Sequence, residues 1–119
     1  MARWYRVFGS LDTLPNWIGS GGSILLECFS AEEEGIRAEL DSWAAYLETC
    51  DGPHHVRLME RAIQTRHLFT LHIPTRDELD PYCVQLCRHL ATETAGFYQI
   101  DDIGFFDADG TLLVNESES

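Results

Sequence analysis

Several stretches of the chain have the apolar and polar spacing of β-strands. Residues 3–9 (RWYRVFG) and 67–73 (HLFTLHI) approach a period of two, which places alternate side chains on opposite faces of a sheet. Residues 23–29 (SILLECF) are mostly apolar, which predicts a buried strand. Residues 97–114 (FYQIDDIGFFDADGTLLV) predict short strands joined by two turns.

Helical spacing predicts a first helix directly after the second strand. Ser30 and Glu33 have the spacing of a capping box, so we expect this helix to begin at Ala31. Its apolar residues recur every three or four positions, and Gly52 supplies a stop signal.

Two further helices are expected, one on each side of the strand at 67–73. Residues 54–66 fit either a helix or a strand, and we favour a helix. The last helix has Asp80 as its N-cap and Pro81 as its first residue. Its apolar stripe includes Cys83 and Cys87, for which we expect buried, reduced and metal-free thiols.

The order strand, strand, helix, helix, strand, helix and strands defines an α+β fold. We expect a single domain over residues 1–119, with a mostly antiparallel sheet and two or three helices packed on one face. A ferredoxin-like sandwich is the leading candidate for its topology.

Charge restricts the partners that this chain can bind. It has 20 acidic residues against 8 basic ones, all of them arginine, and a net charge of -12. Such a charge repels nucleic acids and anionic membranes and favours a basic protein partner. The chain has neither an apolar run long enough to span a membrane nor an apolar leader, so we expect a cytoplasmic protein.

The stretch FFDADGTLL (105–113) matches the nucleophile motif of the haloacid-dehalogenase-like phosphatases. Those enzymes also need a lysine and further acids after the motif, whereas here only six residues follow and there is no lysine. Asp-Gly between apolar runs is a strong hairpin signal, so we interpret Asp107–Gly110 as a turn. A calcium loop would need glycine at its sixth position, which is Leu112, so we expect no metal, no cofactor and no enzymatic activity.

The acids of this predicted hairpin are the candidate binding residues. We expect the hairpin to gather them into one patch for a basic partner, with an aromatic anchor nearby. The candidate residues are Asp101, Asp102, Asp107 and Asp109, with Tyr98 or Phe105 as the anchor.

The stretch LCRHLATETAGFYQIDDIGFFDADGTLL (86–113) resembles the C-terminal end of small immunity-type proteins from bacterial toxin systems. The resemblance covers about a quarter of the chain and lets no single residue be carried across. It implies a cytosolic antidote that binds one toxin and blocks it. Many toxins are basic nucleases, which agrees with the acidic charge.

Two alternatives stay open at this stage. One is a small enzyme or ligand-binding domain with a pocket between sheet and helices, using His67 or His72 with Glu60 or Glu27. The other is a homodimer that forms through an exposed sheet edge.

Overall fold

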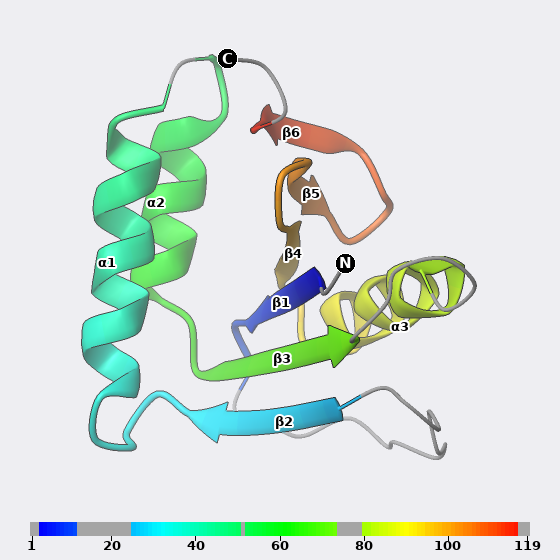
Figure 1. The fold of residues 1–119 in the computed structure, drawn as a ribbon. Helices are drawn as coiled ribbons and strands as arrows, with labels where there is room; N and C mark the ends of the chain where they lie inside the picture. The colour runs from blue at the N-terminus through cyan, green and yellow to red at the C-terminus, as the bar shows by residue number, and fades with distance from the viewer. Residues whose placement is uncertain (1–2, 12–24, 51, 74–79, 117–119) are drawn as a thin grey trace.

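The computed structural model describes residues 3–11, 25–50, 52–73 and 80–116, and it contains one six-stranded sheet and three helices (Figure 1). The elements in chain order are β1 Arg3–Gly9, β2 Leu25–Ser30, α1 Ile36–Glu48, α2 His55–Ile63, β3 His67–Ile73, α3 Asp80–Glu93, β4 Phe97–Ile100, β5 Gly104–Asp107 and β6 Leu112–Asn115. The predicted α+β class and the predicted order of elements are both confirmed. None of the helices among these residues has the length and apolar character that crossing a membrane requires.

The strands lie in the order β2-β3-β1-β4-β5-β6, and every neighbouring pair is antiparallel. The first strand of the chain, β1, therefore lies inside the sheet. Tyr5 is opposite Leu71 of β3 on one side and Ile100 of β4 on the other. The sheet twists strongly along this order, so that β2 and β6 run in different directions in Figure 1.

The helices pack on both faces of the sheet, which corrects the expectation that they share one face. Alternation along β1 sends Tyr5 and Val7 into a core with α3, while Phe8 enters a second core with α1 and α2. On β3, Phe69 joins the first core and Leu68 the second. The two layers of helices lie to either side of the strands in Figure 1.

The ferredoxin-like topology is not confirmed. That arrangement orders its elements β-α-β-β-α-β. Here two strands precede the first helix, two helices follow each other, and three strands end the described chain. The sheet also extends to six strands with β2 and β6 at its edges.

Strand β2 is an edge strand, so the prediction of a buried strand is wrong. Its only described neighbour in the sheet is β3, and Leu25 is 53% exposed. Glu27 and Cys28 are exposed as well. Apolar content alone did not separate an edge strand from a buried one, because both are rich in leucine and aromatic residues.

Helix α1 begins at Ile36, five residues later than predicted. The capping-box contacts do form: the Ser30 N–H donates to the Glu33 carboxylate at 2.5 Å, and the Ser30 hydroxyl accepts from the Glu32 N–H at 3.2 Å. They close a separate turn, because Gly35 has a left-handed φ of 89° that no α-helix accommodates. Gly35 thus moves the start of the helix from the predicted Ala31 to Ile36.

The segment 54–66, which suited either a helix or a strand, contains helix α2, as we favoured. Leu58 and Ala62, one turn apart on α2, are buried beneath it against α1 and the sheet. The strand predicted over 67–73 has the bounds of β3.

The turn at Asp107–Gly110 joins β5 to β6, as predicted. The Gly110 N–H donates to the Asp107 carbonyl at 2.9 Å, and Gly110 has a φ of 94°. The Asp107 and Asp109 carboxylates accept the backbone N–H groups of Ala108 and Thr111 at 2.8 and 2.9 Å. Both acids of the phosphatase-like motif therefore hold a tight turn.

Helix α3 ends in a Schellman motif that contains an alanine in the left-handed region. The Gly96 N–H donates to the Ala91 carbonyl at 2.8 Å, and Ala95 has a φ of 52°. Glycine is the usual residue at such a position because a Cβ atom is strained there.

We expect Ala95→Gly to raise the free energy of unfolding by about 0.5–1 kcal/mol, because it removes this strain. Urea denaturation of both proteins measures the change. The control is Ala45→Gly in the exposed middle of α1, which should lower stability by about 1 kcal/mol. A loss of stability in Ala95→Gly would contradict the prediction.

Candidate functional site

The four candidate acids of the C-terminal strands lie in two separate turns. Asp101 and Asp102 follow β4, whereas Asp107 and Asp109 lie in or beside the β5–β6 turn. Strand β5 separates the pairs, and its four residues span about 10 Å. The prediction that the hairpin gathers all four acids into one patch is therefore wrong.

Arginines approach three of these four acids. Asp101 forms an ion pair with Arg6 at 2.7 Å, and Asp107 lies 3.8 Å from Arg61. The backbone carbonyl of Asp109 accepts a hydrogen bond from the Arg88 guanidinium at 2.9 Å. The hydrogen bond from Thr111 holds the pKa of the exposed Asp109 carboxyl below its usual value. These turns consequently present less net negative charge than their sequence suggests.

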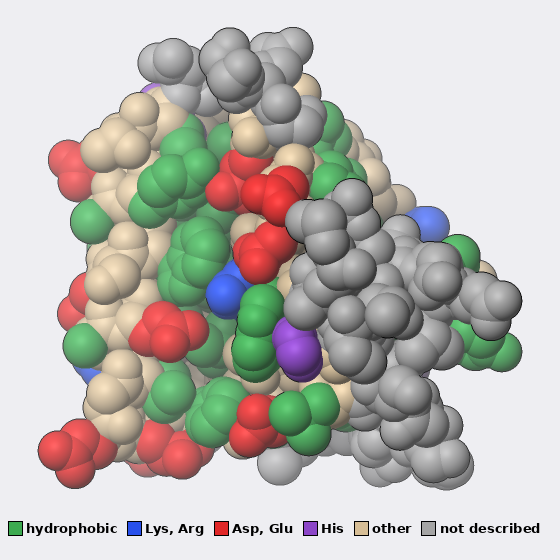
Figure 2. All heavy atoms as spheres, in the orientation of Figure 1, with side chains coloured by type: hydrophobic (Ala, Val, Ile, Leu, Met, Phe, Trp, Pro, Cys, Tyr) green, Lys and Arg blue, Asp and Glu red, His purple; other side chains and the backbone are tan. Residues whose placement is uncertain are grey.

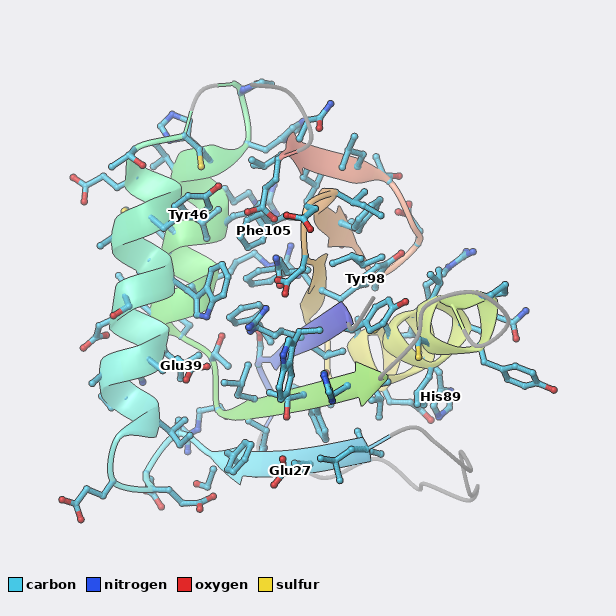
Figure 3. All side chains as sticks on the ribbon, viewed as in Figure 1. Glu27, Glu39, Tyr46, His89, Tyr98 and Phe105 are labelled. Carbon is cyan, nitrogen blue, oxygen red and sulfur yellow. The ribbon has the colours of Figure 1, made fainter. Side chains whose placement is uncertain are left out.

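Neither candidate aromatic anchor reaches the surface, so that expectation is also wrong. Tyr98 is 2% exposed and Phe105 is 0% exposed. They lie in opposite cores, with Tyr98 toward α3 and Phe105 toward Tyr46 of α1 (Figure 3). Burial raises the pKa of the Tyr98 hydroxyl.

A groove between α1 and the strands β1, β2 and β3 is a stronger candidate site. It has a volume of about 260 Å³, large enough for one long side chain. Its lining residues are Trp4, Arg6, Glu27, Phe29, Ile36, Glu39, Leu68 and Thr70. Glu39 extends from α1 toward the sheet, and Glu27 lies on β2 (Figure 3). Neither carboxylate forms an ion pair or hydrogen bond with a described residue.

Arg6 at the floor of this groove belongs to a hydrogen-bond network that crosses the sheet. Its Nη1 donates to Gln99 Oε1 at 2.9 Å and to Asp101 Oδ1 at 2.7 Å. The amide of Gln99 then donates to Asp101 Oδ1 at 3.1 Å and to Glu116 Oε1 at 3.0 Å. The Tyr46 hydroxyl donates to Glu116 Oε2 at 2.9 Å. The network thereby fixes side chains from β1, β4, α1 and the residue after β6.

Aromatic rings surround the Arg6 guanidinium. Its central carbon lies 4.9 Å from the ring centroid of Trp43 and 6.0 Å from that of Trp4. Trp4 also stacks against His72, whose ring centroid is 4.3 Å away. Trp4 is 36% exposed and Tyr46 is 41% exposed, so both present aromatic surface to solvent.

We call this surface the acidic-aromatic face. Its residues are Trp4, Arg6, Glu27, Glu39, Trp43, Tyr46, Asp101 and Glu116. Figure 2 shows carboxylates and apolar side chains gathered around a guanidinium between α1 and the strands. Its four carboxylates outnumber the one guanidinium, and Asp101 already neutralises that guanidinium. The surface therefore carries a net negative charge that is available to attract a cation.

The proposed histidine–carboxylate pocket does not form among the described residues. His72 stacks on Trp4, while His67 Nδ1 lies 3.3 Å from the Leu11 carbonyl oxygen. Neither ring is hydrogen-bonded to Glu27 or Glu60 in this part of the chain. Only Asp101 of the residues predicted to bind a partner belongs to the acidic-aromatic face.

Cys83 and Cys87 are buried in the core beneath α3, as predicted. All four cysteines of the chain are thiols in the structure. Within the described residues, no group of three histidine, cysteine or acidic side chains is arranged to hold a metal ion.

The fold and this face together define an α+β protein with an antiparallel six-stranded sheet and an acidic-aromatic groove on one side. Comparison with protein-family models, with curated proteins and with solved structures found no match to the chain.

Proposed function

We propose that the protein is a non-enzymatic binding module that recognises a basic protein through the acidic-aromatic face. The observation that carries the proposal is the excess of carboxylates over cations beside exposed aromatic rings. Aromatic side chains supply much of the binding energy of protein interfaces, and complementary charge speeds the encounter of partners.

A lysine or arginine side chain of the partner fits the chemistry of the groove. Its cationic head would lie between Glu27 and Glu39, while its aliphatic stem would cover the exposed part of Trp4. Both carboxylates are exposed, so the partner would gain their attraction without first breaking an ion pair with a described residue.

The network below the groove supports binding because it holds the face in one conformation. Gln99 is 1% exposed and forms hydrogen bonds with three other side chains, so its position is strongly constrained. A surface that is already ordered loses less conformational entropy when a partner binds.

An immunity-type protein that blocks a basic toxin would use such a surface, and we propose this role within the class. The proposed place of action is the cytoplasm, where cysteine thiols stay reduced. The exposed Cys28 agrees with that setting.

We expect the double substitution Glu27→Gln/Glu39→Gln to slow association with the partner about tenfold at low salt, because it removes the steering charge of the groove. The partner is first captured from the protein's native host cells and identified. Association and dissociation rates are then measured at low and high salt, and the wild-type association rate should fall as salt screens the charges. Trp4→Ala should mainly raise the dissociation rate.

The matched control is Glu60→Gln/Glu93→Gln, which removes the same charge from exposed positions on α2 and α3. It should leave the association rate within about twofold of wild type. Equal slowing by the two double variants would show that only total charge matters and would reject the acidic-aromatic face as the binding site. An acidic partner would reject the proposed function itself.

A further inference from the structure

A second pocket, independent of the acidic-aromatic face, has the opposite charge. It lies where α2 meets the β5–β6 hairpin and has a volume of about 160 Å³. Its lining residues are His54, Arg57, Leu58, Arg61, Asp107 and Leu113. The lining thus contains two guanidiniums and an imidazole but only one carboxylate. This excess of basic groups contrasts with the net charge of the chain, which is -12.

Arg61 is the central cation of this pocket, and its charge is only partly compensated. Its side chain is 23% exposed, and its Nη1 lies 3.8 Å from Asp107 Oδ1. The guanidinium carbon lies 5.1 Å from the ring centroid of Phe97. No hydrogen bond joins this guanidinium to another described residue. Burial lowers the pKa of Arg61, and the positive charge of Arg57 acts in the same direction.

The arrangement of the pocket's charges is unfavourable without a ligand. Arg57 and Arg61 are one helical turn apart on α2, where two like charges destabilise a helix. Asp107 offsets them weakly, because the same Oδ1 atom accepts the Ala108 N–H at 2.8 Å and holds the turn. An anion bound between the two arginines would remove this repulsion.

We propose that the pocket formed by Arg57, Arg61 and His54 binds a phosphate-type oxyanion, either free phosphate or a phosphate group on another molecule. Guanidinium groups donate paired hydrogen bonds to the oxygens of phosphate, and two of them can hold one dianion from different directions. The hydrocarbon side chains of Leu58 and Leu113 form the apolar part of the lining and reduce competition from water.

The test is a calorimetric titration of the intact protein with inorganic phosphate at constant ionic strength. We expect saturable binding in the millimolar range or tighter, and Arg57→Gln should weaken it about tenfold or more. Arg57 is exposed, so its substitution should leave the fold intact. Arg61→Gln should abolish binding, and a thermal melt of each variant confirms that it is folded.

The matched control is Arg37→Gln, which removes an exposed arginine of α1 that pairs with Asp41 outside this pocket. It should bind phosphate as the wild type does. A peptide with one phosphoserine and no other charge distinguishes the sources: tighter binding of the peptide indicates a phosphate group on a protein, and tighter binding of inorganic phosphate indicates the free anion.

Three results would overturn the proposal. The first is no saturable binding of phosphate or of the peptide. The second is binding that Arg57→Gln weakens no more than Arg37→Gln does. The third is an equal affinity for acetate at the same ionic strength, because acetate has a single charge and two oxygens, whereas a phosphate dianion has twice the charge and more oxygens to accept hydrogen bonds from two arginines.

Discussion

Phe105→Ala should lower the free energy of unfolding by about 3–5 kcal/mol, the range for removing a buried phenylalanine from a core. The side chain of Phe105 is 0% exposed. Its ring centroid lies 5.8 Å from that of Trp43, 6.2 Å from that of Tyr46 and 6.3 Å from that of Phe97. Alanine would leave a cavity between β5 and α1. Urea denaturation followed by fluorescence and circular dichroism measures the loss.

The control is Tyr82→Ala on α3, because Tyr82 is 69% exposed and its removal should change stability by no more than about 0.5 kcal/mol. This pair also separates two roles for Phe105. Truncating a core residue lowers the stability of the protein, whereas truncating a surface anchor lowers its affinity for the partner and leaves its stability unchanged. A change below about 1 kcal/mol in Phe105→Ala would contradict its place in the core.

Gly96→Ala should destabilise the protein by about 3 kcal/mol or more, because there is no space for a side chain at this position. A Cβ atom on Gly96 would lie 2.0 Å from the carbonyl oxygen of Phe8 and 3.0 Å from the Cα of Gly9. Both are backbone atoms at the end of β1, so no rotamer change relieves the overlap. Strands β1 and β4 would have to separate at Phe8 and Phe97, which face each other in the sheet.

The comparison is Gly35→Ala, where a Cβ atom meets nothing within 4 Å but φ is 89°. That variant carries only the backbone strain, about 1–2 kcal/mol. Chemical denaturation of both variants compares the loss of stability from the steric overlap at Gly96 with the loss from backbone strain at Gly35. A Gly96→Ala protein as stable as the wild type would show that β1 and β4 approach each other less closely than the structure indicates.

Local patterns predicted the elements well because they depend on neighbouring residues. The period of two correctly predicted strands β1 and β3, and the Asp-Gly pair correctly predicted the β5–β6 turn. The predicted start of α1 was wrong because a capping box specifies a turn but does not ensure that the next residues continue as a helix. The left-handed conformation of Gly35 decides where the helix begins.

The distribution of helices over two faces had a signal in the sequence that we did not use. Leu68, Phe69 and Leu71 place apolar side chains on both faces of β3, which is typical of a strand covered on both sides. A sheet covered on both sides also explains why Tyr98 and Phe105 are both buried, because they enter opposite cores from neighbouring strands.

The acidic-aromatic face was largely beyond sequence analysis. Trp4 lies on the face of β1 opposite Tyr5 and Val7, which agrees with the period of two over residues 3–9. Its neighbours in the face depend on tertiary contacts such as that between Arg6 and Asp101, 95 positions apart. No local pattern brings Glu39 and Glu27 to the same groove, because they belong to a helix and to a strand that meet only in the folded protein.

The position of β1 has a consequence for how the chain folds during synthesis. Strand β1 comes before both of its neighbours in the sheet, β3 and β4, and the second of these ends at Ile100. The interior of the sheet therefore cannot close until β4 has left the ribosome. Its closure depends on contacts between segments far apart in the sequence, which form more slowly than local ones.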